Sequence, residues 1–352
     1  MWNNKGDFLL CICCLTYNQS NYIKDTLDGF CMQQTTFPFY AVVFDDASTD
    51  GEQEVIKGYL DEHFEQSEGS GYQQWETEDA FFAFARHKEN ESCHFLVVYQ
   101  KKNLYQTPRK DELIGELCVA KYIAFCEGDD YWTYPLKLQK QVGFLEEHEE
   151  FVVCASRHSV FFEDEKRMDD HDQFEHLLQK GQDGLELTVD NYFQIGVLPQ
   201  MLTLVYRFGI LKKSEWFNKL KNRSKYDQTM LFSFVEFGKI WVMNENMGVY
   251  RRHVGGVATS LSRKQAAEKM YYTWRDVYEV HPIEVVKDLY VTNLKHYYYY
   301  LVKHGANLFG EEVRALKKEY KVLDEPLKNR ICFFGRLLKG MALRSFSKEK
   351  NE

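Results

Sequence analysis

The sequence has little of several features that would set its class at once. Only 6 of its 352 residues are Pro, which excludes long proline-rich linkers. Its 9 Cys include one Cys-x-x-Cys spacing, Cys11 to Cys14, but this lies inside an apolar run and no second Cys or His pair stands at zinc-finger distance from it. It has no run of about 20 apolar residues, which a membrane-spanning helix would need. Positive charge is not in excess either: 44 Lys and Arg against 53 Asp and Glu give a net charge of −9, which argues against a nucleic-acid partner.

Cysteine usage indicates a reducing compartment. The count of 9 is odd, so the cysteines do not form a complete disulfide framework. Residues 1–7 are polar, and the apolar run after them is too short for a secretory signal peptide. We therefore expect free thiols and a cytoplasmic protein.

Short apolar runs alternate with helical patterns in the first half of the chain. An apolar run with a polar stop predicts a strand buried on both faces, and apolar residues three and four apart predict a helix. The alternation predicts a parallel sheet with crossover helices. Residues 65–91 are expected to form an irregular or partly helical insertion. The predicted strands are 8–15, 40–44, 94–99 and 122–126, and the predicted helices are 22–33, 52–64 and 110–121.

Two of these strands end in adjacent carboxylates. Asp45 and Asp46 follow the second strand, and Asp129 and Asp130 follow the fourth. Ligands bind outside the carboxyl ends of strands in open parallel sheets, and adjacent carboxylates repel unless a cation or hydrogen-bond donors compensate them. The alternative is that these side chains cap helices or fix turns. Because both pairs stand at equivalent strand ends, the pattern favours a binding site.

Four motifs in this order resemble family 2 glycosyltransferases, in particular bacterial enzymes that build surface polysaccharides. The resemblance extends over about residues 8–257. The motifs are Thr16-Tyr17-Asn18, then Asp45-Asp46-Ala47-Ser48-Thr49-Asp50-Gly51, then Glu127-Gly128-Asp129-Asp130-Tyr131-Trp132, and finally Tyr226-Asp227 followed by residues 244–253.

The resemblance implies a GT-A fold, which is an α/β architecture with a Rossmann-like, mostly parallel sheet flanked by helices. We expect this nucleotide-sugar-binding and catalytic domain over residues 1–260 and a helical C-terminal region over residues 261–352. The end of that region, residues 326–352, carries a net charge of +5 and an apolar stripe at helical spacing. Such a tail favours either a surface-lying helix on anionic lipid or a helix docked on the protein.

The same resemblance implies a nucleoside diphosphate sugar as donor, with a UDP-sugar favoured. Thr16, Tyr17 and Asn18 would belong to the donor site, with Thr16, Tyr17 and Asp46 around the base. The Asp46 carboxylate would accept the ring N–H. Asp129 would contact the ribose.

A divalent ion and a general base complete the implied site. Asp130 would hold Mn²⁺ or Mg²⁺ on the diphosphate, with His253 as a further ligand and Arg251 facing phosphate. An equally weighted alternative for His253 is a side chain that structures its loop. Family 2 enzymes invert at the anomeric carbon and use one base to take the acceptor proton, and Asp227 occupies that position.

These residues together predict an inverting, metal-dependent glycosyltransferase. Its acceptor is expected to be a glycan or lipid-linked glycan at the inner face of the membrane. The alternative is a non-catalytic sugar-nucleotide or glycan-binding module on the same fold, which would have no need of Asp227. A nucleotidyltransferase is disfavoured because the turn at Thr16 lacks a glycine-rich phosphate loop.

Overall fold

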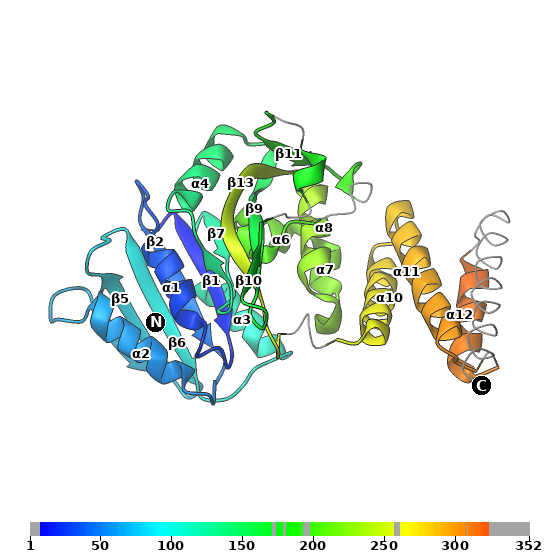
Figure 1. Cartoon of the computed structure of the whole chain (residues 1–352), viewed down its shortest axis with the longest axis horizontal. Helices are drawn as coiled ribbons and strands as arrows, with labels where there is room; N and C mark the ends of the chain where they lie inside the picture. Colours follow the sequence, from blue (N-terminus) through cyan, green and yellow to red (C-terminus); the bar gives the residue numbers. More distant parts are fainter. Residues whose placement is uncertain are drawn as a thin grey trace. The chain divides into compact units, whose positions relative to one another are not determined.

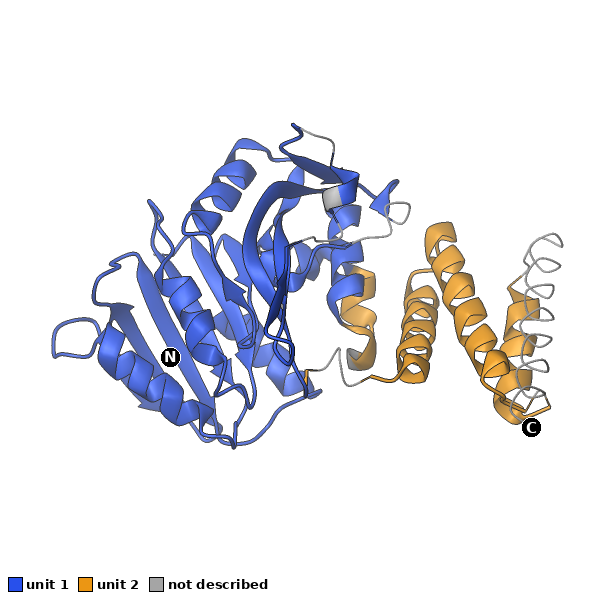
Figure 2. Cartoon of the chain, viewed as in Figure 1, with its two compact units in different colours: residues 1–214, 226–254 blue, residues 215–225, 255–352 orange. Residues whose placement is uncertain are grey.

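The computed structural model describes residues 8–170, 174–178, 181–192, 198–256, 261–307 and 309–323, and it divides into two compact units. Unit 1 consists of residues 1–214 and 226–254, and unit 2 of residues 215–225 and 255–352 (Figure 2). The short segment 215–225 thus joins the second unit, although it lies inside the range expected for the first domain. The roles assigned to the two parts stay predictions.

Unit 1 is built on a sheet whose centre is parallel. The central strands are β1 (Leu10–Thr16), β2 (Phe39–Asp45), β6 (Cys93–Gln100) and β7 (Tyr122–Phe125). They lie in the order β7-β1-β2-β6, and all three pairings are parallel. In Figure 1, α1 (Ile23–Cys31) and α2 (Glu52–His63) lie over the face of this sheet that is turned to the viewer. The predicted alternation of strands and helices is confirmed, and with it the predicted fold class.

Antiparallel strands extend the sheet beyond β6. The strand β5 (Ala80–His87) pairs with β6, and β3 (Phe64–Glu65) and β4 (Gln73–Glu76) pair with β5. The prediction of an irregular or partly helical insertion over residues 65–91 is therefore wrong. Residues 80–85 form an apolar run as long as those of the predicted strands, so the signal for β5 is present in the sequence; the polar, glycine-containing residues before it drew the whole segment into the insertion.

On the other side, a long strand brings its carboxyl end to the loop after β7. β13 (Lys239–Arg252) pairs in parallel with β9 (Phe151–Phe162), with register shifts around Asn246. The backbone continues through these bulges as one strand. β8 (Tyr131–Trp132) pairs with β13 and so ties the loop after β7 to it. β12 (Val205–Arg207) pairs with β7 and β9.

The other elements of unit 1 surround this sheet. The Trp132 side chain is buried, its Nε1 donates to the Leu202 carbonyl at 2.8 Å, and its ring lies 5.0 Å from that of Phe30. Trp132 is therefore a core residue.

The remaining elements of unit 1 are α3 (Pro108–Leu117), α4 (Lys137–Glu147), β10 (Arg167–Asp169), β11 (Gly184–Leu187), α6 (Ile210–Lys213), α8 (Asp227–Phe237) and the 3₁₀ turns Glu175–Leu177 and Met201–Thr203.

Unit 2 is helical. Tyr297 is buried, with its ring 5.6 Å from that of Tyr271, so the tyrosine-rich helix packs against a second helix as expected. The predicted basic tail, residues 326–352, lies outside the described residues. The elements are α7 (Glu215–Lys219), the 3₁₀ turn Asn222–Ser224, α10 (Arg263–Val280), α11 (Glu284–Lys303) and α12 (Glu311–Val322).

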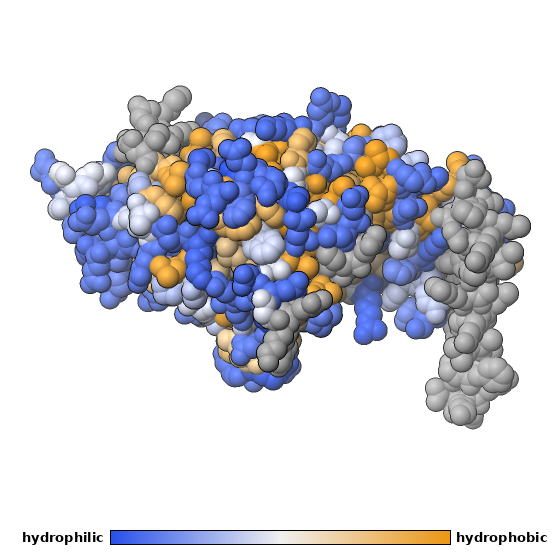
Figure 3. Space-filling view, turned by 90° about the horizontal axis from the view of Figure 1, so that it is seen from above, coloured by the Kyte–Doolittle hydropathy of each residue, from blue (hydrophilic) through white to orange (hydrophobic). Residues whose placement is uncertain are grey.

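The surface carries no membrane-spanning element in the part of the chain that the structure describes. None of the described helices is both long enough and apolar enough to cross a bilayer. The face drawn in Figure 3 mixes hydrophilic residues with hydrophobic ones, as the surfaces of folded proteins generally do.

Candidate active site

One buried carboxylate joins the loops that follow β1 and β2. Glu52, the first residue of α2, accepts hydrogen bonds from Thr16 Oγ1, from the Gln19 backbone N at 2.9 Å and from Ser48 Oγ at 2.8 Å. Its side chain is fully buried, and this burial raises the pKa of the Glu52 carboxyl. Thr16 is thus held from behind by Glu52, at the point where β1 ends.

The loop after β1 presents Tyr17 to solvent. Asn18 has a left-handed backbone with φ of 55°, which asparagine tolerates better than most residues. Its N–H donates to Ser48 Oγ at 2.9 Å, and its Oδ1 accepts from the Thr49 N–H at 2.7 Å. Tyr17 is 46% exposed, and Asn18 is exposed too. Asn18 fixes the loop through its hydrogen bonds, and Tyr17 offers a ligand an aromatic ring.

The two carboxylates of the first pair have different partners. Asp45 Oδ1 accepts from the Ser48 N–H at 3.1 Å, so Asp45 fixes the turn after β2, as in the alternative to a binding role. Asp46 is also buried: its Oδ1 accepts from the Leu104 N–H at 2.6 Å, and its Oδ2 forms an ion pair with Lys110 Nζ at 2.9 Å. Contact between Asp46 and a nucleobase therefore requires Lys110 to move. The assignment of Asp46 to the nucleobase stays a prediction.

Close packing fixes the loop after β7. A Cβ at Gly128 would lie 2.3 Å from Thr16 Oγ1, so only glycine allows this approach to β1. Thr26 Oγ1 of α1 donates to the carbonyls of Gly128 at 3.0 Å and of Asp130 at 2.6 Å. The three elements β1, α1 and β7 therefore meet at this loop.

The second carboxylate pair points in two directions. Asp130 is buried, and its Oδ1 accepts from the Arg251 backbone N–H at 2.9 Å. Burial, and then the charges of Asp129 and Glu127, raise the pKa of Asp130 well above its usual range. Asp129 Oδ2 instead lies 3.0 Å from Nε2 of His253. The structure thus brings His253 to Asp129 and not to Asp130, with which the sequence had grouped it.

The pair of Asp129 and His253 has the chemistry of a cation site. His253 Nδ1 lies 3.0 Å from the Val254 carbonyl, so its proton can donate there and leave a lone pair on Nε2. That lone pair then faces a carboxylate oxygen, and such a pairing needs a proton or a metal ion between the two acceptors. Octahedral ligands of Mg²⁺ also lie about 3 Å apart. Among the described residues no cluster of three or more His, Cys, Asp or Glu could hold a metal, so an ion here would take its other ligands from substrate and water.

Arg251 serves the protein framework. Its Nε donates to the Asp129 carbonyl at 2.9 Å, and its two terminal nitrogens form ion pairs with Glu163 and Asp25. The guanidinium also lies 4.9 Å from the ring centre of Tyr22. Because these partners use the guanidinium fork, the predicted contact of Arg251 with phosphate has no support in this arrangement.

Asp227 opens α8 and lies near the acidic loop. The cap of this helix is Tyr226, whose N–H donates to Thr229 Oγ1 at 3.1 Å, so Asp227 is not the capping residue. Asp227 is exposed in the first turn, where the helix dipole favours a carboxylate. Glu127 keeps some surface open to solvent, but protein surrounds most of its carboxyl group. This partial loss of solvent, and then the charges of Asp129 and Asp227, raise the pKa of Glu127 to about 8.

Comparisons with known proteins identify what the chain resembles. Residues 11–72, from β1 to the loop after β3, match the family model of glycosyl transferase family 2. Curated relatives of the chain are the uncharacterized proteins Mb1547 of Mycobacterium bovis and Rv1520 of Mycobacterium tuberculosis, each 30% identical over 69% of this chain. The match spans 58% of the relatives' own length.

Solved structures share the fold of this chain. The structure of S. aureus TarS residues 1–349 with UDP-GlcNAc is 17% identical, with a TM-score of 0.54 over 95% of this chain and 81% of that one. The structure of the same protein with UDP is 16% identical, with a TM-score of 0.56 over 98% of this chain and 92% of that one. At this identity the likeness establishes the GT-A fold alone.

Sequence reasoning missed three residues of the site. Glu52 and Lys110 lie on helices that follow the motifs, and neither stands in a recognisable pattern. Glu127 is the first acid of the third motif, two positions before Asp129, so its place in the motif was the available signal.

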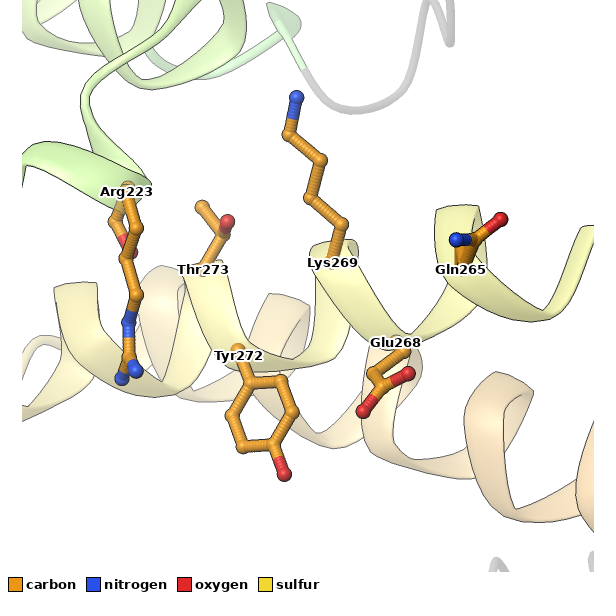
Figure 4. A pocket seen from close by; sticks show the side chains of 7 residues that line it. Arg223, Gln265, Glu268, Lys269, Tyr272 and Thr273 are labelled. Carbon is orange, nitrogen blue, oxygen red and sulfur yellow. The ribbon is translucent and has the colours of Figure 1, made fainter. Parts of the chain in front are cut away.

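A separate hollow of about 240 Å³ lies in unit 2, lined by Arg223, Ser224, Gln265, Glu268, Lys269, Tyr272 and Thr273. Figure 4 shows that Tyr272 and Glu268 point to one side of α10 and Lys269 to the other. Arg223 is bound by the buried Asp276, with Nε at 2.8 Å from Oδ2. No predicted site residue lines this hollow.

Proposed function

We propose that the chain transfers a sugar from a UDP-sugar to a hydroxyl of a glycan or lipid-linked acceptor, with inversion at the anomeric carbon. The observation that carries this proposal is the exposed Asp227 at the first turn of α8, beside the acidic loop that follows β7. A carboxylate that neither caps its helix nor is buried is suited to act on a substrate. The complexes of TarS with UDP and UDP-GlcNAc support a uridine nucleotide as the donor.

The donor is proposed to lie across the carboxyl ends of β1, β2 and β7. Tyr17 would stack on the nucleobase, because it is the exposed aromatic residue of its loop. Thr16 and Asn18 would hold that loop in place through Glu52 and Ser48. The ribose and diphosphate would then reach the loop that carries Asp129.

A divalent ion, Mn²⁺ or Mg²⁺, would be held by Asp129 and His253. Hard ions prefer carboxylate and phosphate oxygens and keep several waters, which suits a site with only two protein donors. When bound, the ion supplies positive charge beside the leaving diphosphate. We assign Asp130 a positioning role instead, because its buried Oδ1 already holds the Arg251 backbone N–H at 2.9 Å.

Asp227 would take the proton of the acceptor hydroxyl as that oxygen attacks the anomeric carbon from the side opposite the diphosphate. This geometry requires the acceptor to enter beside α8. The bacterial and polysaccharide setting, the location at the inner membrane face and the membrane contact of residues 326–352 remain proposals that rest on the family resemblance and the tail's charge.

A donor screen tests the proposal. The full chain is mixed with UDP-, GDP- and dTDP-sugars, with and without Mn²⁺, and its melting temperature is recorded. A ligand that binds only the folded state raises the melting temperature by mass action. We expect stabilisation by one or more UDP-sugars that is larger with Mn²⁺. Equal or absent responses to all nucleotides would contradict the donor assignment.

A further inference from the structure

Cys31 differs from the other described cysteines in its exposure. Cys31 is the last residue of α1 and is partly exposed. All the other cysteines in the described ranges are buried, namely Cys11, Cys13, Cys14, Cys93, Cys118, Cys126 and Cys154. Within this part of the chain, Cys31 is therefore the cysteine that a dissolved oxidant or alkylating reagent reaches most readily.

The sulfur of Cys31 lies in a cluster of side chains that has no role in the proposed transfer. Asn90, which lies between His87 and Cys93 in the chain, donates from Nδ2 to the Cys31 carbonyl at 2.9 Å and so brings this segment to the end of α1. The Cys93 thiol and the His87 imidazole both act on the pKa of Cys31. Tyr59 Oη lies 3.5 Å from Cys31 Sγ and donates to Asp28 Oδ1 at 2.7 Å. The cluster thus joins α1, α2, β5 and β6, and it places a second thiol next to the exposed one.

The backbone fixes the tautomer of His87. Its Nδ1 accepts hydrogen bonds from the backbone N–H groups of Glu89 at 3.1 Å and of Asn90 at 2.9 Å. In the neutral ring the proton must then be on Nε2. Nε2–H is the donor that remains for the Cys31 sulfur, and a donated hydrogen bond stabilises a thiolate over a thiol.

The charges around Cys31 act in both directions. Burial raises the pKa of Cys31, but its interactions with Cys93, His87 and Tyr59 outweigh burial and lower that pKa to about 6. The interaction with Cys31 in turn raises the pKa of His87. The other titratable or charged groups that face the cluster are Asp28, which accepts from Tyr59, His63, whose ring lies 6.2 Å from that of His87, and Glu89 and Lys88 beside His87.

We propose that Cys31 and Cys93 form a reversible oxidation site, in which Cys31 is the nucleophile and Cys93 the resolving thiol. The Cys31 thiolate attacks one oxygen of a peroxide, the O–O bond breaks, and Cys31 becomes a sulfenic acid while hydroxide leaves. The Cys93 sulfur then attacks the Cys31 sulfur, and the sulfenic hydroxyl leaves as water with the Cys93 proton. Two thiols are oxidised by two electrons, and the peroxide is reduced to two waters.

The chain contains its own matched control. Cys118 also lies within hydrogen-bonding reach of two thiols, those of Cys11 and Cys13, but all three are buried. Proximity of thiols alone would oxidise this second cluster as readily as the first. Exposure together with an imidazole donor selects the Cys31–Cys93 pair.

The experiment maps the products of peroxide treatment on the full chain. The chain carries Cys332→Ser, because Cys332 lies outside the described residues. It is treated with hydrogen peroxide at pH 7, blocked with a maleimide, digested and analysed by mass spectrometry. We expect a disulfide-linked pair of peptides containing Cys31 and Cys93, two hydrogens lighter than the two thiol peptides, which dithiothreitol reduces back to them. The peptides of Cys11, Cys13 and Cys118 should show no oxidation. In Cys93→Ser, dimedone should label Cys31.

A second measurement separates a reactive thiol from a merely accessible one. The alkylation rate of Cys31 is followed against pH in the parent and in His87→Asn, whose amide oxygen can still accept from the loop backbone. We expect an inflection near pH 6 in the parent and one closer to the ordinary thiol value of about 8.5 in the variant. Equal oxidation of the Cys118 cluster, an unmodified Cys31, an unchanged inflection in His87→Asn, or stoichiometric bound zinc in the purified chain would each overturn the proposal.

Discussion

Replacing Glu52 tests whether one buried carboxylate holds the two donor loops. In Glu52→Ala, the hydroxyls of Thr16 and Ser48 and the N–H of Gln19 lose their common acceptor. A buried donor left without a partner costs about 1–3 kcal/mol. Since water can enter the space and the hydroxyls can turn, we expect a total loss of about 3–5 kcal/mol. For a unit of this size that lowers the melting temperature by roughly 10 °C.

Glu52→Gln is the matched variant. Its amide oxygen can accept from the Gln19 N–H and from Ser48, and its amide nitrogen can face Thr16 Oγ1, which still donates to Gln19 Oε1 at 2.7 Å. We therefore expect stability within about 1 kcal/mol of the parent. Because Asn18 is held through Ser48, UDP affinity should fall in the alanine variant and persist in the glutamine variant.

Thermal melts and calorimetric titration of UDP decide between the outcomes. The reasoning fails if Glu52→Ala melts with the parent and binds UDP equally well. It also fails if Glu52→Gln is as damaged as Glu52→Ala, because the acceptor geometry would then not be what matters.

Three further outcomes follow from the structure and sequence. Burial lowers the pKa of Lys137 from 10.5 to about 7, so the unfolded chain binds more protons above pH 7 and this residue's contribution to stability rises toward pH 10. Urea titrations at pH 7 and pH 9 should show that rise in the parent and a smaller one in Lys137→Met. Asp129→Asn should abolish the Mn²⁺ dependence of UDP binding in calorimetry, whereas Asp130→Asn should mainly lower the melting temperature; the opposite pattern would return the metal to Asp130. Truncation before residue 326 should weaken co-sedimentation with anionic vesicles, and equal co-sedimentation would remove the tail from membrane binding.

The sequence predicted the centre of the sheet because its strands are continuous apolar runs. Each such run in β1 and β2 is followed by a polar motif, so the strand, its direction and the edge that carries the site could be read together. β5 contains a similar run in residues 80–85 and was missed only because the polar, acidic residues before it were read as one insertion. Its partners β3 and β4 are short and carry no such run, so their pairing could not be predicted.

The site was predicted at the level of motifs and less well at the level of contacts. The neighbours Asp129 and Asp130 differ only in which way each side chain turns, and that depends on β13, which supplies both the Arg251 N–H and His253. The ion pair of Asp46 with Lys110 joins residues 64 positions apart, and no local sequence pattern predicts it. Long-range pairing of this kind decides side-chain roles, and a single sequence does not contain it.

The most direct test of the central claim is the rate of sugar transfer by Asp227→Asn, measured together with its affinity for UDP. Asn has nearly the shape of Asp but cannot take the acceptor proton. The matched control is Asp111→Asn, which removes an exposed carboxylate from the first turn of α3. We expect Asp227→Asn to bind UDP like the parent and to lose about 10²–10⁴-fold in kcat, while Asp111→Asn keeps full activity. Normal turnover by Asp227→Asn would contradict the assignment of Asp227 as the catalytic base.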